Sequence, residues 1–498
     1  MTTASLPLPW RLQLLVPALV VIAMTAVVVS SLGAPLIPTL AVTDHVSLPT
    51  AQWSLTVTLL VGAVATPTMG RLGDGPHRRQ VILTALSVVV LGSVLAALPL
   101  SFGWLVLGRG LQGIGLGLIP LTIATARDAL PPERSRPAVA LLSIATVAGI
   151  GLGYPVTGVI AQHLGYHAGF WFGAAVVALA LAVAAAVLPS SAGLPAHPLD
   201  TLGALLLGGG LVALLLGLSE AETWGWTSVR LLALAVGAVV LFAVWVVHEL
   251  RTPYPLIDLR LVRHRAVLTA NAMAVCTGVG VYLLIATIVR YVQTPAAAGY
   301  GFGASILVAG LVLLPFSATS VAASRVAPLI ARRISPDAVL PVGCLMFLAA
   351  MLTFMFARGS LWQAFVTMAV AGLGVGCTFA AMPGMIVRAV PLQETGSAMS
   401  FNQVLRYVGY SVGSVLSATI LQAHTAAGRP LPSESGYGAV ALVSVLVLAL
   451  ATVLSVALPL AARSTPVDQV LIDESIADGL PYEEPYGAAH PRRDLAVD

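Results

Sequence analysis

Three arginines lie within long apolar stretches of this chain. Their side chains could bind anions there. They are Arg109, Arg290 and Arg406, and no Asp or Glu lies near the centre of any such stretch. A guanidinium is always charged, and its planar fork of donors suits carboxylate and phosphate groups. A buried charge is costly unless it faces a polar cavity or a partner, so these groups predict an electropositive cavity that repels cations. Arg109 is our first choice for contacting an anionic ligand and Arg406 the second. For Arg109, pairing with backbone carbonyls is the alternative role.

A second group of charges lies in residues 70–79, GRLGDGPHRR, between two long apolar stretches. Asp74 is a lone carboxylate among Arg71, Arg78 and Arg79. The glycines at 70, 73 and 75 allow helix ends and backbone to come close, and a proline at 76 prevents a helix from continuing through. These residues predict a tight turn whose carboxylate is available to bind a helix N-terminus, where anions are favoured.

Other patterns that suggest chemistry are weak. His163 and His167 are one helical turn apart, but no third ligand is nearby, so we predict no metal. Gly-x-Gly-x-Gly occurs at 113–117, 149–153 and 372–376 without a preceding strand, which indicates helix packing and not a nucleotide loop. We therefore expect no cofactor, no nucleic-acid partner and no enzymatic activity. Three cysteines are isolated in apolar stretches and have no paired spacing: Cys276, Cys344 and Cys377.

Composition identifies the elements that must position these charges. With 58% hydrophobic and 9% charged residues, the chain has more apolar surface than a soluble core could bury, so we expect an all-α polytopic membrane protein. A helix of about 20 apolar residues crosses the ~30 Å core of a bilayer. We place fourteen such spans, centred near residues 23, 60, 90, 114, 149, 178, 210, 239, 281, 312, 348, 374, 409 and 448.

Arginines gather in alternate loops, which predicts a multi-pass protein of the cell (plasma) membrane with both termini in the cytoplasm. The basic turn at 70–79 has an echo at 324–333, since both follow a span and end in paired arginines. This repetition divides the chain into a six-helix half at 1–190, two inserted helices with linkers at 191–265, and a second six-helix half at 266–462. The acidic, proline-containing segment 463–498 is predicted to be a disordered cytoplasmic tail.

The turn at 70–79 resembles the loop between helices 2 and 3 of major facilitator superfamily transporters, Gly-x-Leu-x-Asp-Arg-x-Gly-Arg-Lys. Positions 70, 72, 74, 78 and 79 match, whereas Gly75 and His77 depart from the pattern. Residues 105–115 resemble the second signature of the superfamily, in which an Arg precedes Gln and Gly. Residues 149–159 resemble the exporter signature Gly-x-x-x-Gly-Pro-x-x-Gly-Gly, with Tyr154 and Val159 in place of two glycines.

Segments 303–315 and 396–409 resemble helices 10 and 13 of the fourteen-helix drug:proton antiporters. The resemblance therefore runs through all of the chain but the tail, and it implies the major facilitator fold, with two six-helix halves plus two inserted helices. It also implies that the spans centred at 23, 114, 281 and 374 line a transport path. Candidate path residues are Arg109, Gln112, Met24, Tyr282, Phe379, Met382 and Arg406, although Met and aromatic residues at such spacing are more often plain packing.

Conformational gating is assigned by the same resemblance to two groups of residues. We expect Asp74 to lie against Gly396 and Ser397 and to share its carboxylate with Arg78 or Arg136. We also expect the span at 149 to bend at Pro155 and to press a glycine face, Gly149, Gly153 and Gly158, against the second half. The candidate gating residues are Gly70, Asp74, Arg78, Arg79, Gly153, Pro155 and Gly158.

The function implied is secondary active transport, with export of an amphipathic organic compound or drug by alternating access between the halves. The partners are a small-molecule substrate, the lipid bilayer and, for antiport, protons, and the protein is expected to be a monomer. Proton-coupled relatives commonly carry a carboxylate within helix 1, and aligning residues 38–40 with theirs puts Val29 there. The alternatives are a facilitator or importer of an anionic metabolite, and a membrane-embedded enzyme or sensor.

Overall fold

The computed structural model describes residues 10–32, 36, 40–41, 43–190, 198–426 and 431–460, and a few side chains within the helices also lie outside the description. All regular structure in the described residues is helical. The helices are α1 Trp10–Ser31, α3 Leu48–Gly73, α4 Arg78–Ala97, α5 Phe102–Gly113, η2 Ile114–Gly117, α6 Leu118–Ala129, α7 Pro132–Leu164, α8 Tyr166–Val187, α9 Thr201–Trp224, α10 Val229–Arg251, α11 Leu259–Val262, α12 Arg265–Gln293, η3 Ala296–Ala298, α13 Ile306–Val312, α14 Leu314–Arg333, η4 Pro336–Ala338, α15 Val339–Phe356, α16 Leu361–Ala389, η5 Leu392–Glu394, α17 Thr395–Ala423 and α18 Glu434–Leu460.

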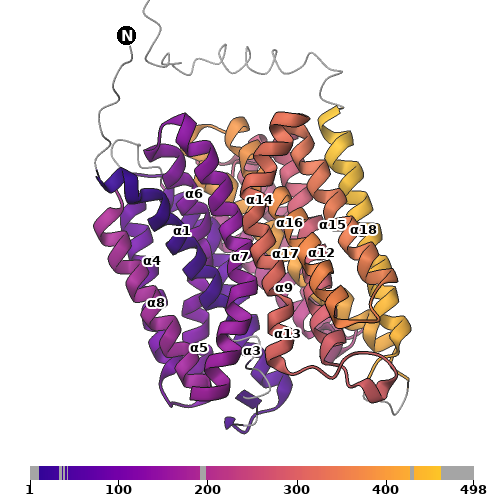
Figure 1. Ribbon diagram of the computed structural model, residues 1–498. Helices are drawn as coiled ribbons and strands as arrows, with labels where there is room; N and C mark the ends of the chain where they lie inside the picture. Colours follow the sequence, from indigo (N-terminus) through magenta and orange to yellow (C-terminus); the bar gives the residue numbers. More distant parts are fainter. Residues whose placement is uncertain are drawn as a thin grey trace, which may run out of the picture.

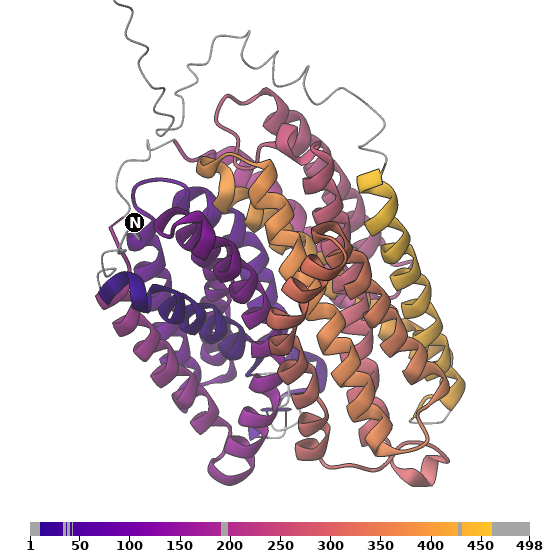
Figure 2. The same ribbon diagram turned by 45° about the horizontal axis from the view of Figure 1, so that its top comes forward.

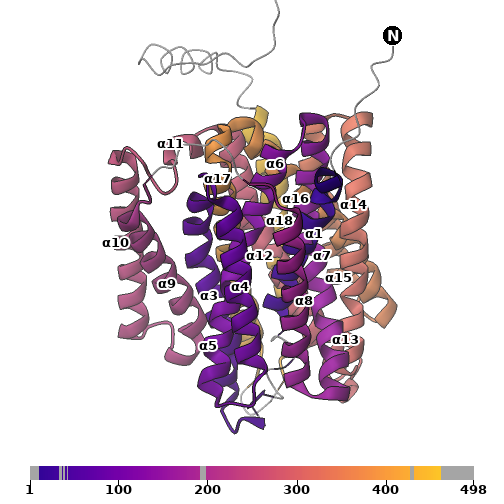
Figure 3. The ribbon, with the colours of Figure 1, turned by 90° about the vertical axis from the view of Figure 1, so that its left-hand side faces the viewer.

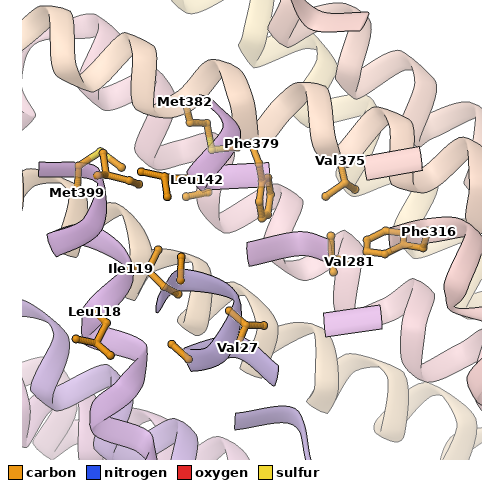
Figure 4. Packing of buried hydrophobic residues seen from close by; sticks show 14 of the residues in the cluster. Val27, Leu118, Ile119, Leu142, Val281, Phe316, Val375, Phe379, Met382 and Met399 are labelled. Atoms are coloured by element: carbon orange, nitrogen blue, oxygen red, sulfur yellow. The ribbon is translucent and has the colours of Figure 1, made fainter. Parts of the chain in front are cut away.

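The helices form two groups that lie side by side. Figure 1 shows the indigo and purple helices α1 to α8 on one side and the orange to yellow helices up to α18 on the other, and Figure 2 shows the same division from a tilted view. The beginning of α1 and the end of α18 lie at the same end of the bundle. The largest buried cluster draws apolar side chains from both groups, for example Val27 and Leu142 from the first and Phe316 and Phe379 from the second (Figure 4).

The predicted all-α polytopic fold is confirmed. Thirteen helical segments of the described residues are long and apolar enough to cross a membrane. The 33-residue helix α7 lies where a further span is predicted, although many of its side chains are outside the description. Each of the fourteen predicted centres lies inside a helix. The total of fourteen spans stays a prediction, as do the domain boundaries, and the segment 463–498 lies outside the described residues.

Two predicted spans are interrupted for reasons that the sequence explains. The span centred at 114 is made of α5 and α6 joined by one 3-10 turn, η2, in a glycine-rich segment. A Cβ added at Gly113 would collide with the carbonyl oxygen of Thr58, so glycine is what lets α5 approach α3. The span centred at 312 divides into α13 and α14 just before Pro315, which has no backbone N–H to continue the hydrogen-bond ladder.

The inserted pair α9 and α10 lies at the edge of the bundle, beside the first group (Figure 3), and α9 packs against α3. A small buried cluster joins Leu207, Leu211 and Trp245 of the pair to Leu116 and Tyr407. Valines and leucines on the outer face of α10 remain exposed, as is expected for a helix that faces lipid. The pair therefore packs on the outside of both groups without entering the interface between them.

Candidate functional site

Asp74 binds the N-terminus of α17. Its two carboxylate oxygens accept hydrogen bonds from the backbone amides of Gly396, at 2.6 Å, and Ser397, at 2.9 Å. Asp74 caps the end of α3 and is buried. A helix N-terminus has unsatisfied N–H groups and a positive dipole end, so it is a natural anion site. The predicted contact between the two groups of helices is therefore confirmed, and we call it the latch; the end of the bundle where it lies is the Asp74 end.

Two further contacts reinforce the latch across the same interface. Nη1 of Arg71, in the last turn of α3, pairs with Oε1 of Glu394 at 2.8 Å. From α6, Arg127 donates to the hydroxyl of Thr395 and, at 3.1 Å, to the carbonyl oxygen of Val390. The first group of helices thus holds the segment before α17 through one carboxylate and two arginines.

The expectation that Arg78 or Arg136 shares the Asp74 carboxylate is wrong. Arg78 pairs with Asp128 of α6 and donates through Nε to the carbonyl oxygen of Gly73, so it ties the turn to its own half. Arg136 lines a separate cavity. Arg79 donates to the carbonyl oxygen of Ala185 in α8, at 2.8 Å, and also stays within the first half. The arginines that cross the interface beside Asp74 are Arg71 and Arg127 instead, and they bind Glu394, Thr395 and Val390 rather than the Asp74 carboxylate.

Glycine is required at the latch because the helices nearly touch there. A Cβ added at Gly70 would lie 2.8 Å from the carbonyl oxygen of Gly396 and would collide with the Ser400 hydroxyl. A Cβ added at Gly396 would lie 2.5 Å from Oδ1 of Asp74. Both separations are shorter than a carbon atom tolerates, whereas Gly75 in the same turn has room for a side chain. The glycines at 70 and 396 therefore allow α3 and α17 to come close enough for Asp74 to reach the N-terminus of α17.

Burial raises the pKa of Asp74 from its ordinary 3.8 to about 7, against the opposite effect of the two amide hydrogen bonds and with a small further increase from the charge of Glu394. A carboxyl group with a pKa near neutrality changes its charge in the physiological range. The latch therefore contains a group that is able to respond to pH.

Arg109 is fully buried and is satisfied by carbonyl oxygens. Its guanidinium donates to Ser54 of α3 at 3.1 Å and to Val29 and Ser30 of α1 at 3.0 and 2.8 Å. Nη1 also donates to Oε1 of Gln112 at 2.6 Å, and Gln112 in turn donates to Ser93 at 3.0 Å. Arg109 thus holds α1, α3 and α5 together, which is the alternative role that we predicted for it, pairing with backbone carbonyls. Val29, at the position where an acid was sought, supplies a backbone oxygen instead.

Arg406 lies in a different environment at the interface between the halves. It is in the middle of α17 and 3% exposed, and its Cζ lies 3.9 Å from the centroid of the Phe379 ring. Nη2 donates to Oδ1 of Asn402 at 3.3 Å, and Nε has no hydrogen-bond partner. None of the ion pairs among the described residues includes Arg406. Beside it lies a recess too small to admit a water molecule, which is lined by Ile119, Pro120, Ser143 and Thr146 of the first half and by Met399 and Gln403 of α17.

Asn402 fixes the amide that faces Arg406. Its Nδ2 donates at 3.0 Å both to the carbonyl oxygen of Ala270 and to Oδ1 of Asn271, so its Oδ1 is directed toward the guanidinium. The arginine therefore has one amide contact and one aromatic face, whereas Arg109 has four oxygen partners. A group that could supply further acceptors at the interface would find an incompletely paired cation there.

The remaining path candidates fall into two kinds. Phe379 and Met382 are buried on α16 within the main cluster, where Figure 4 shows them with Leu142. Met24 on α1 and Tyr282 on α12 are partly exposed. Arg290 is exposed in the last turn of α12, so it does not lie in the interior with Arg109 and Arg406.

The structure describes only some of the residues on the predicted glycine face of α7. Gly149 and Gly153 are buried, but a Cβ at Gly149 would meet Val27 at 3.0 Å, so Gly149 faces α1 and not the second half. Pro155 and Gly158 lie outside the residues whose side chains are described. The helix does contact the second half through α14 and α16, with Ile144 packed in a cluster with Ala323, Ala327 and Cys377.

Sequence reasoning missed Glu394, Arg127 and Asp128 as members of the interface. Each is an ordinary charged residue near a helix end, so it gave no signal by itself. One signal was available: Glu394 lies two residues before Gly396, where Asp74 was expected to bind. An acid at that position called for a basic partner, and Arg71 is the arginine one helical turn before Asp74.

Comparison with known proteins gives the same family from several directions. The family model of the Major Facilitator Superfamily matches residues 19–414 and matches again over 273–478. The tetracenomycin C resistance and export protein of Streptomyces glaucescens is 27% identical over 382 residues, covering 76% of this chain and 70% of that protein. A multidrug resistance protein B homolog of Mycobacterium tuberculosis is 27% identical over 376 residues, covering 74% of this chain and 68% of that protein.

Among solved structures, the human organic anion transporter MFSD10 (TETRAN) has a similar fold. Its TM-score is 0.62, and the alignment covers 90% of this chain and 100% of that chain. The identity is 16%, so the likeness is one of fold.

Proposed function

The chain belongs to the major facilitator superfamily, and on this premise we propose that it is a secondary transporter that exports neutral or anionic amphipathic organic compounds. Relatives named for tetracenomycin export and for multidrug resistance support export of an organic compound. Alternating access between the two groups of helices is the mode of transport that this architecture serves.

The observation that carries the preference for anions is the incomplete pairing of Arg406. A charged-group hydrogen bond contributes about 1.5–3 kcal/mol, and Nε of Arg406 makes none. The first half contributes the other side of the recess, so a ligand admitted there when the halves move apart would contact both halves. A carboxylate or phosphate would fit the planar guanidinium fork, whereas a quaternary ammonium would be repelled.

Phe379 supplies the other half of an amphipathic site. Its ring is 1% exposed and lies under the guanidinium, next to Met382 of the same helix. Aromatic and methionine side chains adapt to apolar groups of varied shape. The site that we propose therefore combines one charge with an apolar wall, and Tyr282 and Met24 extend the path from α12 and α1.

We propose that protons are the counter-ions and that Asp74 is a titrating group in the cycle. Its carboxyl titrates near neutrality because it is buried. It sits on the contact between the halves, where a change of charge alters the stability of one conformation relative to the other. The latched arrangement is closed at the Asp74 end by the polar contacts of Asp74, Arg71 and Arg127.

Transport into inverted membrane vesicles tests this function. Vesicles from cells that express the protein are given labelled anionic, neutral and cationic amphiphiles, with and without an imposed pH gradient, and empty-vector vesicles are the background. We expect accumulation of anionic and neutral compounds, increased by the gradient and reduced in Arg406→Gln. Accumulation of cations alone, or net movement of an anionic metabolite out of the vesicles, would contradict the proposal.

A further inference from the structure

A second site opens at the Asp74 end, away from Arg406. It is a cavity of about 780 Å³ between the beginning of α7, the beginning of α12, the ends of α14, α16 and α18, and the segment that joins α14 to α15. Drug-sized ligands bind in cavities of about 300–1,000 Å³. The cavity is therefore large enough for a small organic molecule or for part of a lipid.

The charged residues that line this cavity give it a positive mouth. Three arginines, Arg136, Arg265 and Arg388, are on its lining with one acid, Asp337. Arg136 is on α7 of the first half, whereas Arg265 begins α12 and Arg388 is near the end of α16. Arg136 and Arg388 are exposed, so their guanidinium groups are accessible from the solvent or from the membrane surface. An anionic headgroup at the mouth would be attracted from both halves at once.

The interior of the cavity is apolar and has space. Ala140, Val339, Leu340, Ala380 and Met385 are among its lining residues. Gly384 also lines it, and a Cβ added there would meet no atom within 4 Å. Apolar walls below a ring of arginines match a molecule with one charged end and a hydrocarbon body.

This cavity is distinct from the transport path proposed above. Successive residues of a helix are rotated by about 100°, which places Ala380, Gly384 and Arg388 on the face of α16 opposite Phe379 and Met382. None of the residues that line the recess at Arg406 also lines the cavity. A ligand in the cavity would therefore not occupy the position proposed for the cargo.

We propose that the cavity binds an anionic amphiphile, with its headgroup at Arg136 and Arg388 and its hydrocarbon against Gly384 and the apolar wall of α16. The occupant joins α7 of the first half to the second half at the end where the latch closes. It binds better when the two walls are together, and by linkage it favours the latched conformation. Two sources supply this chemistry, a lipid of the inner membrane surface and a free amphiphile.

Native mass spectrometry of the purified full-length protein in dodecyl maltoside tests the proposal without any transport measurement. The probes are phosphatidylglycerol as an anionic lipid, dodecyl phosphate as a free anionic amphiphile, and phosphatidylcholine as a lipid without net charge. We expect one copy of an anionic probe on the wild-type protein. Retention of phosphatidylglycerol alone identifies a membrane lipid as the source, and retention of dodecyl phosphate shows that the headgroup and one chain are sufficient.

Two variants and two matched controls locate the binding site. Gly384→Leu fills the cavity, and Gly237→Leu makes the same change on α10 at a glycine that also has no atom within 4 Å of its Cβ position. Arg136→Gln removes a charge at the mouth, and Arg134→Gln removes an exposed charge from the same turn of α7 that does not line the cavity. The first member of each pair should weaken binding about tenfold or more: Arg136→Gln because it removes one charge-assisted contact, and Gly384→Leu because its side chain occupies the space of the hydrocarbon.

The controls should bind the anionic probes like the wild type. Equal retention of phosphatidylcholine would overturn the proposal, and so would unchanged binding in Gly384→Leu. A variant that fails to fold is recognised by its elution and melting temperature; in that case Ala380→Leu, on the same wall, replaces it with the same expectation.

Discussion

The guanidinium of Arg406 lies over the ring of Phe379, with 3.9 Å between Cζ and the ring centroid. The two residues come from neighbouring helices, α17 and α16, of the second half. A cation over an aromatic face gains about 0.5–2 kcal/mol depending on desolvation, which offsets part of the cost of burying the charge. The stack orients the guanidinium but leaves Nε without an acceptor. Arg406 is therefore held in place without being fully hydrogen-bonded, and the first two predictions rest on this property.

Arg406→Gln should reduce export of an anionic amphiphile about tenfold or more, because it removes a charge-assisted contact of about 1.5–3 kcal/mol with the cargo. Export of a neutral compound of similar shape should change less. The initial rate of accumulation in inverted vesicles measures both, normalised to the amount of protein. Arg290→Gln is the control, since Arg290 is exposed at the end of α12, and equal losses in the two variants would show that the effect is not local.

Arg109→Gln should act on stability and not on selectivity. It removes the hydrogen bonds from the guanidinium to the carbonyl oxygens of Val29, Ser30 and Ser54, and a hydrogen bond to a charged group contributes about 1.5–3 kcal/mol. The melting temperature of the purified protein should fall by several degrees. Arg406→Gln should leave it unchanged or raise it, since fewer partners are lost. The opposite order of melting temperatures would mean that Arg406, and not Arg109, is the structural arginine.

Gly396→Ala should open the latch. The new methyl group would lie 2.5 Å from Oδ1 of Asp74 and 2.7 Å from the carbonyl oxygen of Gly70, so α3 and α17 must separate. Spin labels at Leu72→Cys and Leu392→Cys, both exposed positions beside the latch, report the separation once the native cysteines are replaced. We expect a longer and broader distance distribution. Gly75→Ala has room for its methyl group and should match the wild type; a shift in both variants would refute the explanation by close approach.

Acidification should favour the latched conformation. In that state the pKa of Asp74 is about 7, and in the released, hydrated state the ordinary value of 3.8 applies. Between these values the latched state holds one proton more, so the latch strengthens as pH falls from about 7 toward 4 and weakens as pH rises, by up to about tenfold per pH unit. Above pH 7 the dependence should level off. The same pair of spin labels measures the latched fraction between pH 5 and 8.

Asp74→Asn removes the titrating group and should abolish this pH dependence. An amide side chain offers one acceptor oxygen, so one of the amides of Gly396 and Ser397 loses its partner and the latched fraction falls relative to the wild type at low pH, where Asp74 is protonated. Persistence of the wild-type pH profile in Asp74→Asn would assign the titration to another group.

The sequence was sufficient to predict the fold and the Asp74 contact, because both rest on long apolar spans and on a motif with its own pattern. It was not sufficient for contacts that depend on helix rotation. Helix α7 contacts both α1 of its own half and helices of the second half. A glycine in the sequence does not indicate which of these neighbours it meets, and Gly149 faces α1. The position of Arg290 depended on where α12 ends, and the pairing of Arg78 with Asp128 needed the relative placement of α4 and α6.

The two arginines inside the spans show the same limit. Both are single cations in apolar helices, and the sequence favoured Arg109 as the contact for cargo. Satisfaction of Arg109 by α1 and α3 and incomplete pairing of Arg406 are properties of neighbouring backbone that no local pattern encodes. We therefore propose Arg406 as the first contact for the cargo.

The preference for the charge of the cargo is the central claim, and competition in proteoliposomes tests it most directly. Purified protein is reconstituted, and export of one labelled neutral amphiphile is measured against increasing amounts of an anionic and of a quaternary ammonium competitor of similar size. The account predicts strong competition by the anion, little by the cation, and loss of this difference in Arg406→Gln. Stronger competition by the quaternary ammonium compound in the wild type, unchanged in Arg406→Gln, would contradict it.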